Sequence, residues 1–267
     1  MEEDNREASF GWPQLGICAA VVGLAIWGLL GMALPRTDVL PKHPLQENGG
    51  GLATLPRPQH AVEGAMRPVD CSRQACLALT FDDGPDAHVT PQVLDILRRH
   101  NVRATFYLVG TRVAGNEAIV RQMYKDGHEI GNHSWNHADF TTLNAVQIQQ
   151  QINSTQAAIA NAGVPPPTTF RPPYGAVNAV VRANVPLTIM RWNVDPEDWK
   201  AKDAKDVISK VEATAKRGAV IDMHDTHQQT ADALDQLLNN LTSKYQLVTV
   251  SELFNLPPGQ RGEFFGR

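Results

Sequence analysis

The sequence predicts an α/β fold in which about seven parallel strands and their crossover helices form a (β/α) barrel. From Cys76 onward, short apolar runs alternate with amphipathic helical periods, which is the pattern of α/β proteins. Polar residues of the types that carry chemistry follow the ends of these runs, as they do at the C-terminal strand ends of a barrel. An apolar content of 42% with 19% charged residues is ordinary for a globular domain.

The expected strands are short apolar runs bounded by glycine, proline or polar residues. They occupy residues 77–81, 104–109, 129–131, 168–170, 187–192, 219–223 and 246–250. Helices are expected where apolar residues recur at helical spacing between a capping residue and a stop. They occupy residues 90–100, 116–125, 142–163, 203–217 and 230–241. No structure is expected in the tail at residues 257–267, so the folded domain is placed at residues 76–256.

An uncharged, apolar run at residues 15–34 follows an acidic tail at residues 1–14. A helix of about 20 residues, rising about 1.5 Å per residue, reaches across a bilayer core of about 30 Å. We therefore expect a membrane anchor, although charge bias does not fix its orientation. The alternative is a cleaved signal peptide, but the tail lacks the positive charge typical of one. A flexible linker rich in proline and glycine is expected at residues 35–75.

Charge and cysteine content restrict the partners and the compartment. The net charge of -4 and the pI of about 6.1 provide no basic surface, so nucleic acid is not expected as a partner. No obligate protein partner is evident. Cys71 and Cys76 are close enough in sequence to close a small loop by a disulfide in an oxidising compartment, and two reduced thiols fit the sequence equally well.

Two adjacent carboxylates, Asp82 and Asp83, end the first expected strand in the sequence TFDDGP. Neighbouring carboxylates repel each other unless a cation or a proton transfer uses one of them. Because successive side chains on a strand point to opposite faces, the pair divides into one candidate ligand and one candidate base. The alternative is a strand followed by an ordinary turn of Asp, Gly and Pro.

Other polar residues follow later strands, and a parallel barrel brings such residues to one face. His133 and His137 follow the third strand, and their spacing lets both reach one cation if the segment turns. Two histidines and one aspartate leave positions open for water and substrate, as a catalytic metal site requires. The other members of this face are Arg171, Asp195, Asp198 and His224.

Five motifs in order carry a resemblance to a known family. TFDDGP, HSWNH, RPPYG, DPEDW and the strand that ends in His224-Asp225 resemble the motifs of the polysaccharide deacetylases of carbohydrate esterase family 4. The resemblance extends from Cys76 to about Phe254. It implies a distorted (β/α) barrel with fewer regular units than eight, and a metal-dependent hydrolase that removes acetyl groups from a polysaccharide.

The resemblance also implies roles for the motif residues. Asp83, His133 and His137 correspond to the metal ligands. Asp82 corresponds to the general base that takes a proton from the attacking water, and Arg171 to the residue that orients this base. The set of ligands suits Zn and also accepts Co, Ni or Mn.

The remaining motif residues correspond to groups that act on the acetyl group and the leaving amine. The backbone N–H of Tyr174 resembles the oxyanion donor, and His224 the general acid. Asp198 resembles the carboxylate that orients His224, a role that Asp195 could share. Trp199 resembles a wall of the acetyl pocket, and the substrate-binding set also includes Tyr174, Pro172 and Pro173.

These assignments predict hydrolysis of an acetamide to acetate and a free amine. A deacetylase held on a membrane by a linker meets its own cell wall, which favours N-acetylglucosamine in peptidoglycan as substrate and an extracytoplasmic location. Chitin-type oligomers, other N-acetylated exopolysaccharides and O-acetylated xylan are the alternative substrates. If the N-terminal segment is a signal peptide, the enzyme is secreted.

Two other classes of function share part of this pattern. Two histidines and one carboxylate also describe non-haem iron oxygenases, but those sites need neither a second Asp beside the ligand nor a distant acid such as His224. A glycan-binding module without activity would lack a ligand or the base. Every expected position is filled in this sequence.

Overall fold

The computed structural model describes residues 69–267. The tail expected at residues 1–14, the anchor expected at residues 15–34 and most of the linker expected at residues 35–75 lie outside the described residues. Within residues 69–267, no helix is long and apolar enough to cross a membrane.

A sheet of eight strands forms the centre of the domain. Its strands are β1 (Cys76–Asp82), β2 (Thr105–Leu108), β3 (Glu129–Asn132), β4 (Thr169–Phe170), β5 (Thr188–Met190), β6 (Val220–His224), β7 (Gln246–Leu247) and β8 (Glu263–Phe264). All pairings are parallel, in the order β6-β1-β2-β3-β4-β5-β8, and β7 pairs with the start of β1. The seven strands expected from the sequence are all present, so the predicted fold class is confirmed.

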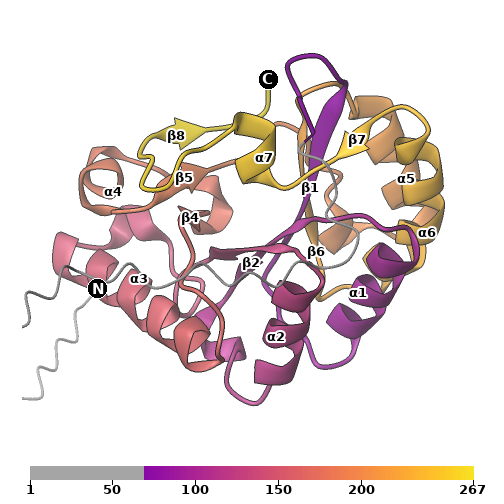
Figure 1. The fold of residues 1–267 in the computed structure, drawn as a ribbon. Coiled ribbons are helices and arrows are strands. Elements are labelled where there is room, and N and C mark those ends of the chain that lie inside the picture. Colours follow the sequence, from indigo (N-terminus) through magenta and orange to yellow (C-terminus); the bar gives the residue numbers. More distant parts are fainter. Residues whose placement is uncertain (1–68) are drawn as a thin grey trace, which may run out of the picture. The chain divides into compact units, whose positions relative to one another are not determined.

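The sheet curls into a distorted barrel (Figure 1). The chain that follows β5 returns to β6, where Val194 forms a parallel bridge with Ile221. The N–H of Asp222 also donates to the carbonyl of Val194 at 2.9 Å. A single bridge rather than a long ladder therefore joins these two parts of the sheet, in agreement with the distorted barrel that the family resemblance implied.

The helices follow the strands in alternation, and α1, α2, α5 and α6 lie outside the sheet (Figure 1). They are α1 (Val89–Arg99), α2 (Glu117–Lys125), α3 (Ala145–Asn161), α4 (Ala179–Asn184), α5 (Ala204–Thr214), α6 (Gln228–Thr242) and α7 (Val250–Phe254). The expected start of the long Gln-rich helix at Thr142 was wrong. That helix, α3, begins after Asn144, whose side chain forms a capping box with Gln147.

Side-chain alternation on β1 separates the outer core from the barrel interior. Leu77, Leu79 and Phe81 are fully buried against the helices, in the same cluster as Leu234 of α6. The alternate residues of β1 belong to the interior, where Ala78 packs in a second cluster with Tyr107. Because the period is 2, Thr80 and Asp82 continue this interior row. The strand therefore delivers a carboxylate to the end of the barrel interior.

The C-terminal tail is ordered, which corrects the expectation that residues 257–267 lack structure. Within it, β8 pairs with β5, and the N–H of Arg191 donates to the carbonyl of Phe264 at 2.7 Å. The Phe264 ring packs against Phe254 with centroids 5.3 Å apart, and Glu263 pairs with Arg182 and Arg191. A strand of two residues contains too little alternation to be recognised in sequence.

A disulfide joins Cys71 to Cys76 at the start of β1. The sequence alone had left reduced thiols equally open.

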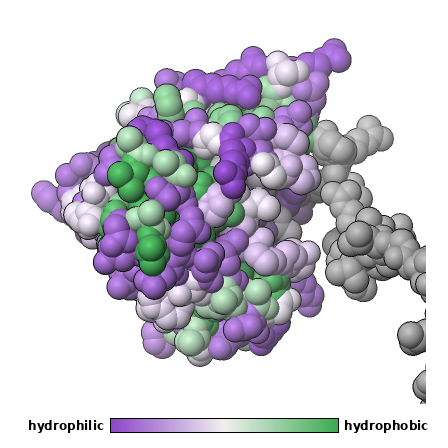
Figure 2. Space-filling model, turned by 90° about the vertical axis from the view of Figure 1, so that its left-hand side faces the viewer, coloured by the Kyte–Doolittle hydropathy of each residue, from purple (hydrophilic) through white to green (hydrophobic). Residues whose placement is uncertain are grey.

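Figure 2 shows the side of the domain that carries α3 and α4, where hydrophilic residues dominate and apolar residues gather in small groups. Val146 on α3 and Val180 on α4 are among the exposed apolar side chains.

Candidate active site

A cavity of about 440 Å³ lies where the C-terminal ends of the strands meet. Eight of its lining residues were predicted from the sequence to belong to the site. They are Asp82, Asp83, His133, His137, Tyr174, Asp195, Trp199 and His224. Arg171 and Asp198 are fully buried behind this lining. Pro172 and Pro173 are buried and lie outside the lining, so the structure does not place them in the pocket wall.

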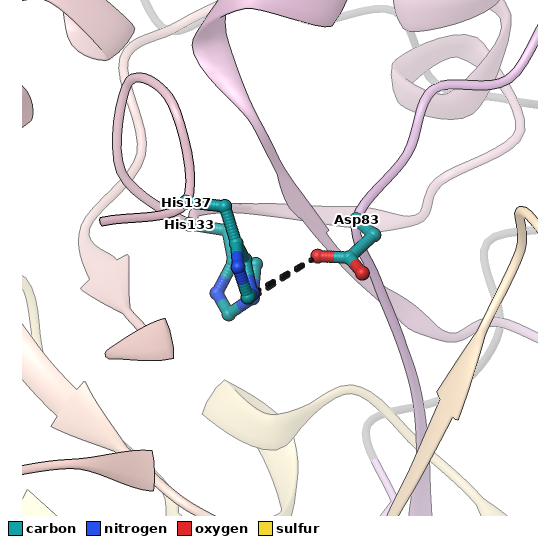
Figure 3. A group of neighbouring side chains, drawn as sticks. All are labelled: Asp83, His133 and His137. Atoms are coloured by element: carbon teal, nitrogen blue, oxygen red, sulfur yellow. Dashed lines mark ion pairs between the residues drawn. The ribbon is translucent and has the colours of Figure 1, made fainter. Parts of the chain in front are cut away.

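Asp83, His133 and His137 form a candidate metal centre. One ligand atom from each lies within 4.8 Å of the other two, and both imidazole rings face the Asp83 carboxylate (Figure 3). The Oδ1 atom of Asp83 is 3.5 Å from Nε2 of His133 and 3.3 Å from Nε2 of His137. This buried oxygen has no hydrogen-bond donor in the described residues, as expected of an atom that is meant to contact a cation.

The tautomer of His133 also fits a metal ligand. Its Nδ1 lies 2.8 Å from the carbonyl oxygen of Arg171, and a carbonyl only accepts, so we assign the hydrogen to Nδ1. The lone pair on Nε2 then points toward Asp83. Burial lowers the pKa of His133 to about 4, against the opposing charge of Asp83. This pattern, in which one nitrogen is held by a backbone carbonyl, is usual for ligating histidines.

Asp82 and Asp83 both reach His133, which corrects the expectation that they point to opposite faces. Oδ2 of Asp82 lies 3.6 Å from Nε2 of His133, and Oδ1 of Asp83 lies 3.5 Å from the same atom. The strand ends at Asp82, and Asp83 has a φ of 71°. This turn brings the Asp83 carboxylate back to the interior side. The predicted division into a base and a ligand remains compatible with the geometry.

Several loops of the site hold strained backbone. Of seven non-glycine residues with positive φ in the described chain, five belong to the motif loops. They are Asp83, Ser134, His137, Tyr174 and Glu197. Left-handed conformations of this kind cost of order 1–3 kcal/mol each and occur often at functional sites. Secondary-structure patterns in the sequence do not reveal them.

Arg171 is completely buried and bonds to Asp82, the candidate base. Its Nη1 donates to Oδ1 of Asp82 at 2.9 Å and to Oδ1 of Asp222 at 2.7 Å. The guanidinium carbon lies 4.3 Å from the centre of the Tyr107 ring, which fixes the plane of the group. Burial raises the pKa of Asp82 to about 6, although the charge of Arg171 opposes that rise.

Asp222 is a buried carboxylate of the site that the sequence reasoning missed. It stands opposite Thr80 in the β1–β6 register, and both residues bond to Nη1 of Arg171. Burial and the negative charge of Asp82 raise the pKa of Asp222 well above its ordinary value. Because Asp222 is two residues before His224 on the same strand, the period of 2 could have placed both on the interior face.

His224, the candidate acid, is hydrogen-bonded to Asp198. Asp198 begins the short helix η4 (Asp198–Lys200). Its Oδ1 lies 2.7 Å from Nδ1 of His224, and its Oδ2 accepts from the His224 N–H and from the Thr230 hydroxyl. Burial alone lowers the pKa of His224, but the hydrogen bond and charge of Asp198, together with Asp222 and Asp82, raise it to about 10.

Asp195 does not share the contact with His224. Its Oδ1 accepts from the N–H of Glu197 at 2.7 Å and so stabilises the turn before η4.

Tyr174 lies in the short helix η3 (Pro173–Gly175), and its ring packs edge-on against His137 with centroids 4.7 Å apart. Tyr174 and Trp199 are 68% and 52% exposed, so both can contact a bulky ligand at the rim of the cavity.

The pH dependence of catalysis should follow the contact between Asp198 and His224. A general acid works in its protonated form, so kcat/KM is retained below the pKa of His224, about 10, and lost above it. Asp198→Asn keeps an acceptor for Nδ1 but removes the charge, so the alkaline limb should move toward neutral pH. The pH profile of kcat/KM measures this shift. An unchanged alkaline limb would remove His224 from the acid role.

The fold and the site together define a barrel protein with a candidate metal centre, a candidate carboxylate base and a candidate histidine acid on one face. Residues 70–188 match the family model for polysaccharide deacetylase. The chain is 47% identical over 179 residues to the peptidoglycan-N-acetylglucosamine deacetylase PgdA of Listeria monocytogenes, with 67% of this chain and 38% of that protein covered. It is 37% identical over 191 residues to a peptidoglycan-N-acetylglucosamine deacetylase of Bacillus cereus, with 68% of this chain and 89% of the relative covered.

A solved structure with the same fold is a family 4 acetyl xylan esterase of Clostridium thermocellum in complex with a cobalt ion. It superposes with a TM-score of 0.65 at 36% identity and covers 70% of this chain and 97% of that one. The chain therefore belongs to the polysaccharide deacetylase family, carbohydrate esterase family 4, whose members are hydrolases. It spans only 38% of the length of the Listeria relative.

Proposed function

We propose that the chain is a metal-dependent hydrolase that removes N-acetyl groups from N-acetylglucosamine residues of peptidoglycan. The observation that carries the proposal is one cavity lined by the Asp83, His133 and His137 cluster, by Asp82 and by His224. Hydrolysis of an amide needs a base for water, a stabiliser for the oxyanion and an acid for the leaving nitrogen. Each of these groups has a candidate in this cavity.

Asp82 is the candidate base. Its Oδ1 is occupied by Arg171, while its Oδ2 lies on the side of His133. The carboxylate is thus fixed by one oxygen and can accept a proton from water with the other. A bound divalent ion, Zn or alternatively Co, Ni or Mn, would be held by Asp83, His133 and His137 and would supply charge to polarise the acetyl carbonyl and lower the pKa of the attacking water.

The acid and the oxyanion donor complete the reaction. The N–H of Tyr174 is the candidate donor to the oxygen that becomes negative when water adds to the carbonyl. His224, protonated on Nδ1 toward Asp198, offers its Nε2 hydrogen to the leaving nitrogen. The C–N bond then breaks, acetate forms, and the sugar keeps a free amine.

Several observations favour peptidoglycan. The Listeria and Bacillus cereus relatives are named for peptidoglycan N-acetylglucosamine. The disulfide between Cys71 and Cys76 suits an oxidising compartment outside the cytoplasm.

We further propose that residues 15–34 anchor the chain in the membrane with the domain outside the cytoplasm. Recovery of the full chain from the culture medium rather than the membrane fraction would contradict the anchor.

The substrate is tested by incubating the Zn-loaded full chain with peptidoglycan, chito-oligosaccharides and acetylated xylan. We expect equal amounts of acetate and free amine from peptidoglycan, with mass spectrometry of the muropeptides placing the amine on glucosamine. Preferred turnover of chito-oligosaccharides would reassign the substrate. Acetate without amine, from xylan, would indicate an esterase. Binding without release of acetate would indicate a glycan-binding module.

A further inference from the structure

Asp225 is a buried carboxylate to which the proposed reaction gives no role. It follows His224 directly and has no exposed surface. Its Oδ2 accepts a hydrogen bond from the Thr90 hydroxyl at 2.5 Å. Its Oδ1 has no hydrogen-bond partner among the described residues. A buried carboxylate oxygen without a donor is costly, so the position of this side chain calls for a specific reason.

The Asp225 carboxylate packs against Gly84, the residue after the candidate ligand Asp83. A Cβ atom added to Gly84 would lie 2.4 Å from Oδ1 and 2.5 Å from Oδ2 of Asp225. The φ of Gly84 is outside the left-handed region, so its backbone alone does not require glycine. The space taken by Asp225 is what excludes a side chain at this position.

Other contacts hold the same turn from different directions. The carbonyl of Gly84 accepts from the N–H of Val109, just after β2, at 2.9 Å. The Thr90 hydroxyl that donates to Asp225 also accepts from the N–H of Asp86 at 2.8 Å. The turn is therefore held between the end of β2 on one side and the pair of Thr90 and Asp225 on the other.

We infer that Asp225 is a positioning residue that locks the Asp83–Gly84 turn and thereby fixes the Asp83 carboxylate opposite His133 and His137. The lock also ties the loop of the candidate acid, His224, to the loop of the candidate ligand. This inference rests on the proposed function, because it assumes that Asp83 binds the catalytic ion. Groups that orient ligands without touching the ion typically change metal affinity by about 10–100-fold.

The test is the Kd for Zn of full-chain variants, measured by competition with a chromophoric chelator. Asp225→Ala and Gly84→Ala should each raise the Kd by about 10-fold. Asp225→Ala removes the carboxylate that holds the turn, and Gly84→Ala adds a methyl group that collides with this carboxylate. The Kd of the double variant should be lower than the product of the two single increases in Kd predicts, because the methyl group that Gly84→Ala adds enters the space that the Asp225 carboxylate has left. Asp225→Asn, which keeps the shape and the acceptor for Thr90, should stay closer to wild type than Asp225→Ala.

A matched pair of threonine variants separates this role from general stability. Thr90→Val should raise the Kd for Zn. Thr188→Val should not, although Thr188 is also buried and its hydroxyl loses its bond to the carbonyl of Gln260. If Asp225→Ala does not fold, as judged by thermal unfolding, the Thr90→Val result decides.

Two results would overturn the inference and can be told apart from failure of the proposed function. An unchanged Kd in Asp225→Ala or Thr90→Val, or single effects that simply multiply in the double variant, would show that no lock acts on Asp83. A wild-type chain that binds no Zn would contradict the proposed function itself, and the inference with it.

Discussion

Replacing Asp82 with Asn is expected to lower kcat/KM for acetate release by about 1000-fold, which is within the range for loss of a general base. Asn has the same shape, and its carbonyl oxygen can still accept the 2.9 Å bond from Nη1 of Arg171. It cannot take a proton from water. Because Asp82 lies outside the ligand cluster, the variant should keep its Zn.

Kinetics and metal content are measured on the same preparation of the Asp82→Asn chain. Asp203→Asn is the matched control, because Asp203 caps α5 through its side chain, away from the site, and Asn caps equally well. The control should keep wild-type activity. Normal turnover by Asp82→Asn would refute the base assignment, and loss of Zn would mean that Asp82 is a ligand.

Replacing His133 with Ala is expected to weaken Zn binding by at least about 100-fold and to abolish activity, because one of the three ligands is lost. Elemental analysis after dialysis against metal-free buffer gives the bound Zn per chain. His100→Ala is the control, since His100 lies at the end of α1 and contacts Asp235 instead of the site.

Loss of the buried His133 side chain also leaves the carbonyl of Arg171 without a partner, so folding must be checked. His137→Ala provides a second variant, because its side chain is 29% exposed and its removal disturbs the core less. Stoichiometric Zn in both folded variants would contradict the ligand set.

The strand ends were predictable because polar residues there follow short, strongly apolar runs. Leu77 to Phe81 ends in two carboxylates, and three later strands are followed by His133, Arg171 and His224. Parallel strands bring such ends to one face, so the meeting of Asp82, His133 and His224 could be expected without knowledge of distances. The order of the five motifs then supplied the family.

Other features depend on tertiary contacts that leave little local signal. β8 is held by pairing with β5 and by the packing of Phe264 on Phe254. The positive φ of Asp83 overrides the strict alternation of a strand. The spacing of Asp222 and His224 indicates a shared face of β6, but the contact of Asp222 with Arg171, distant in sequence, appears only in the folded domain. Asp195, which the sequence allowed to share the role of Asp198, bonds its own turn.

The most direct test of the account is acetate release from peptidoglycan by the full chain before metal removal, after chelation, and after addition of one equivalent of Zn. A site of Asp83, His133 and His137 that holds one ion predicts loss of activity on chelation and recovery at one Zn per chain. Acetate release that continues unchanged in the chelated chain, with no Zn detected by elemental analysis, would contradict metal-dependent deacetylation at this site.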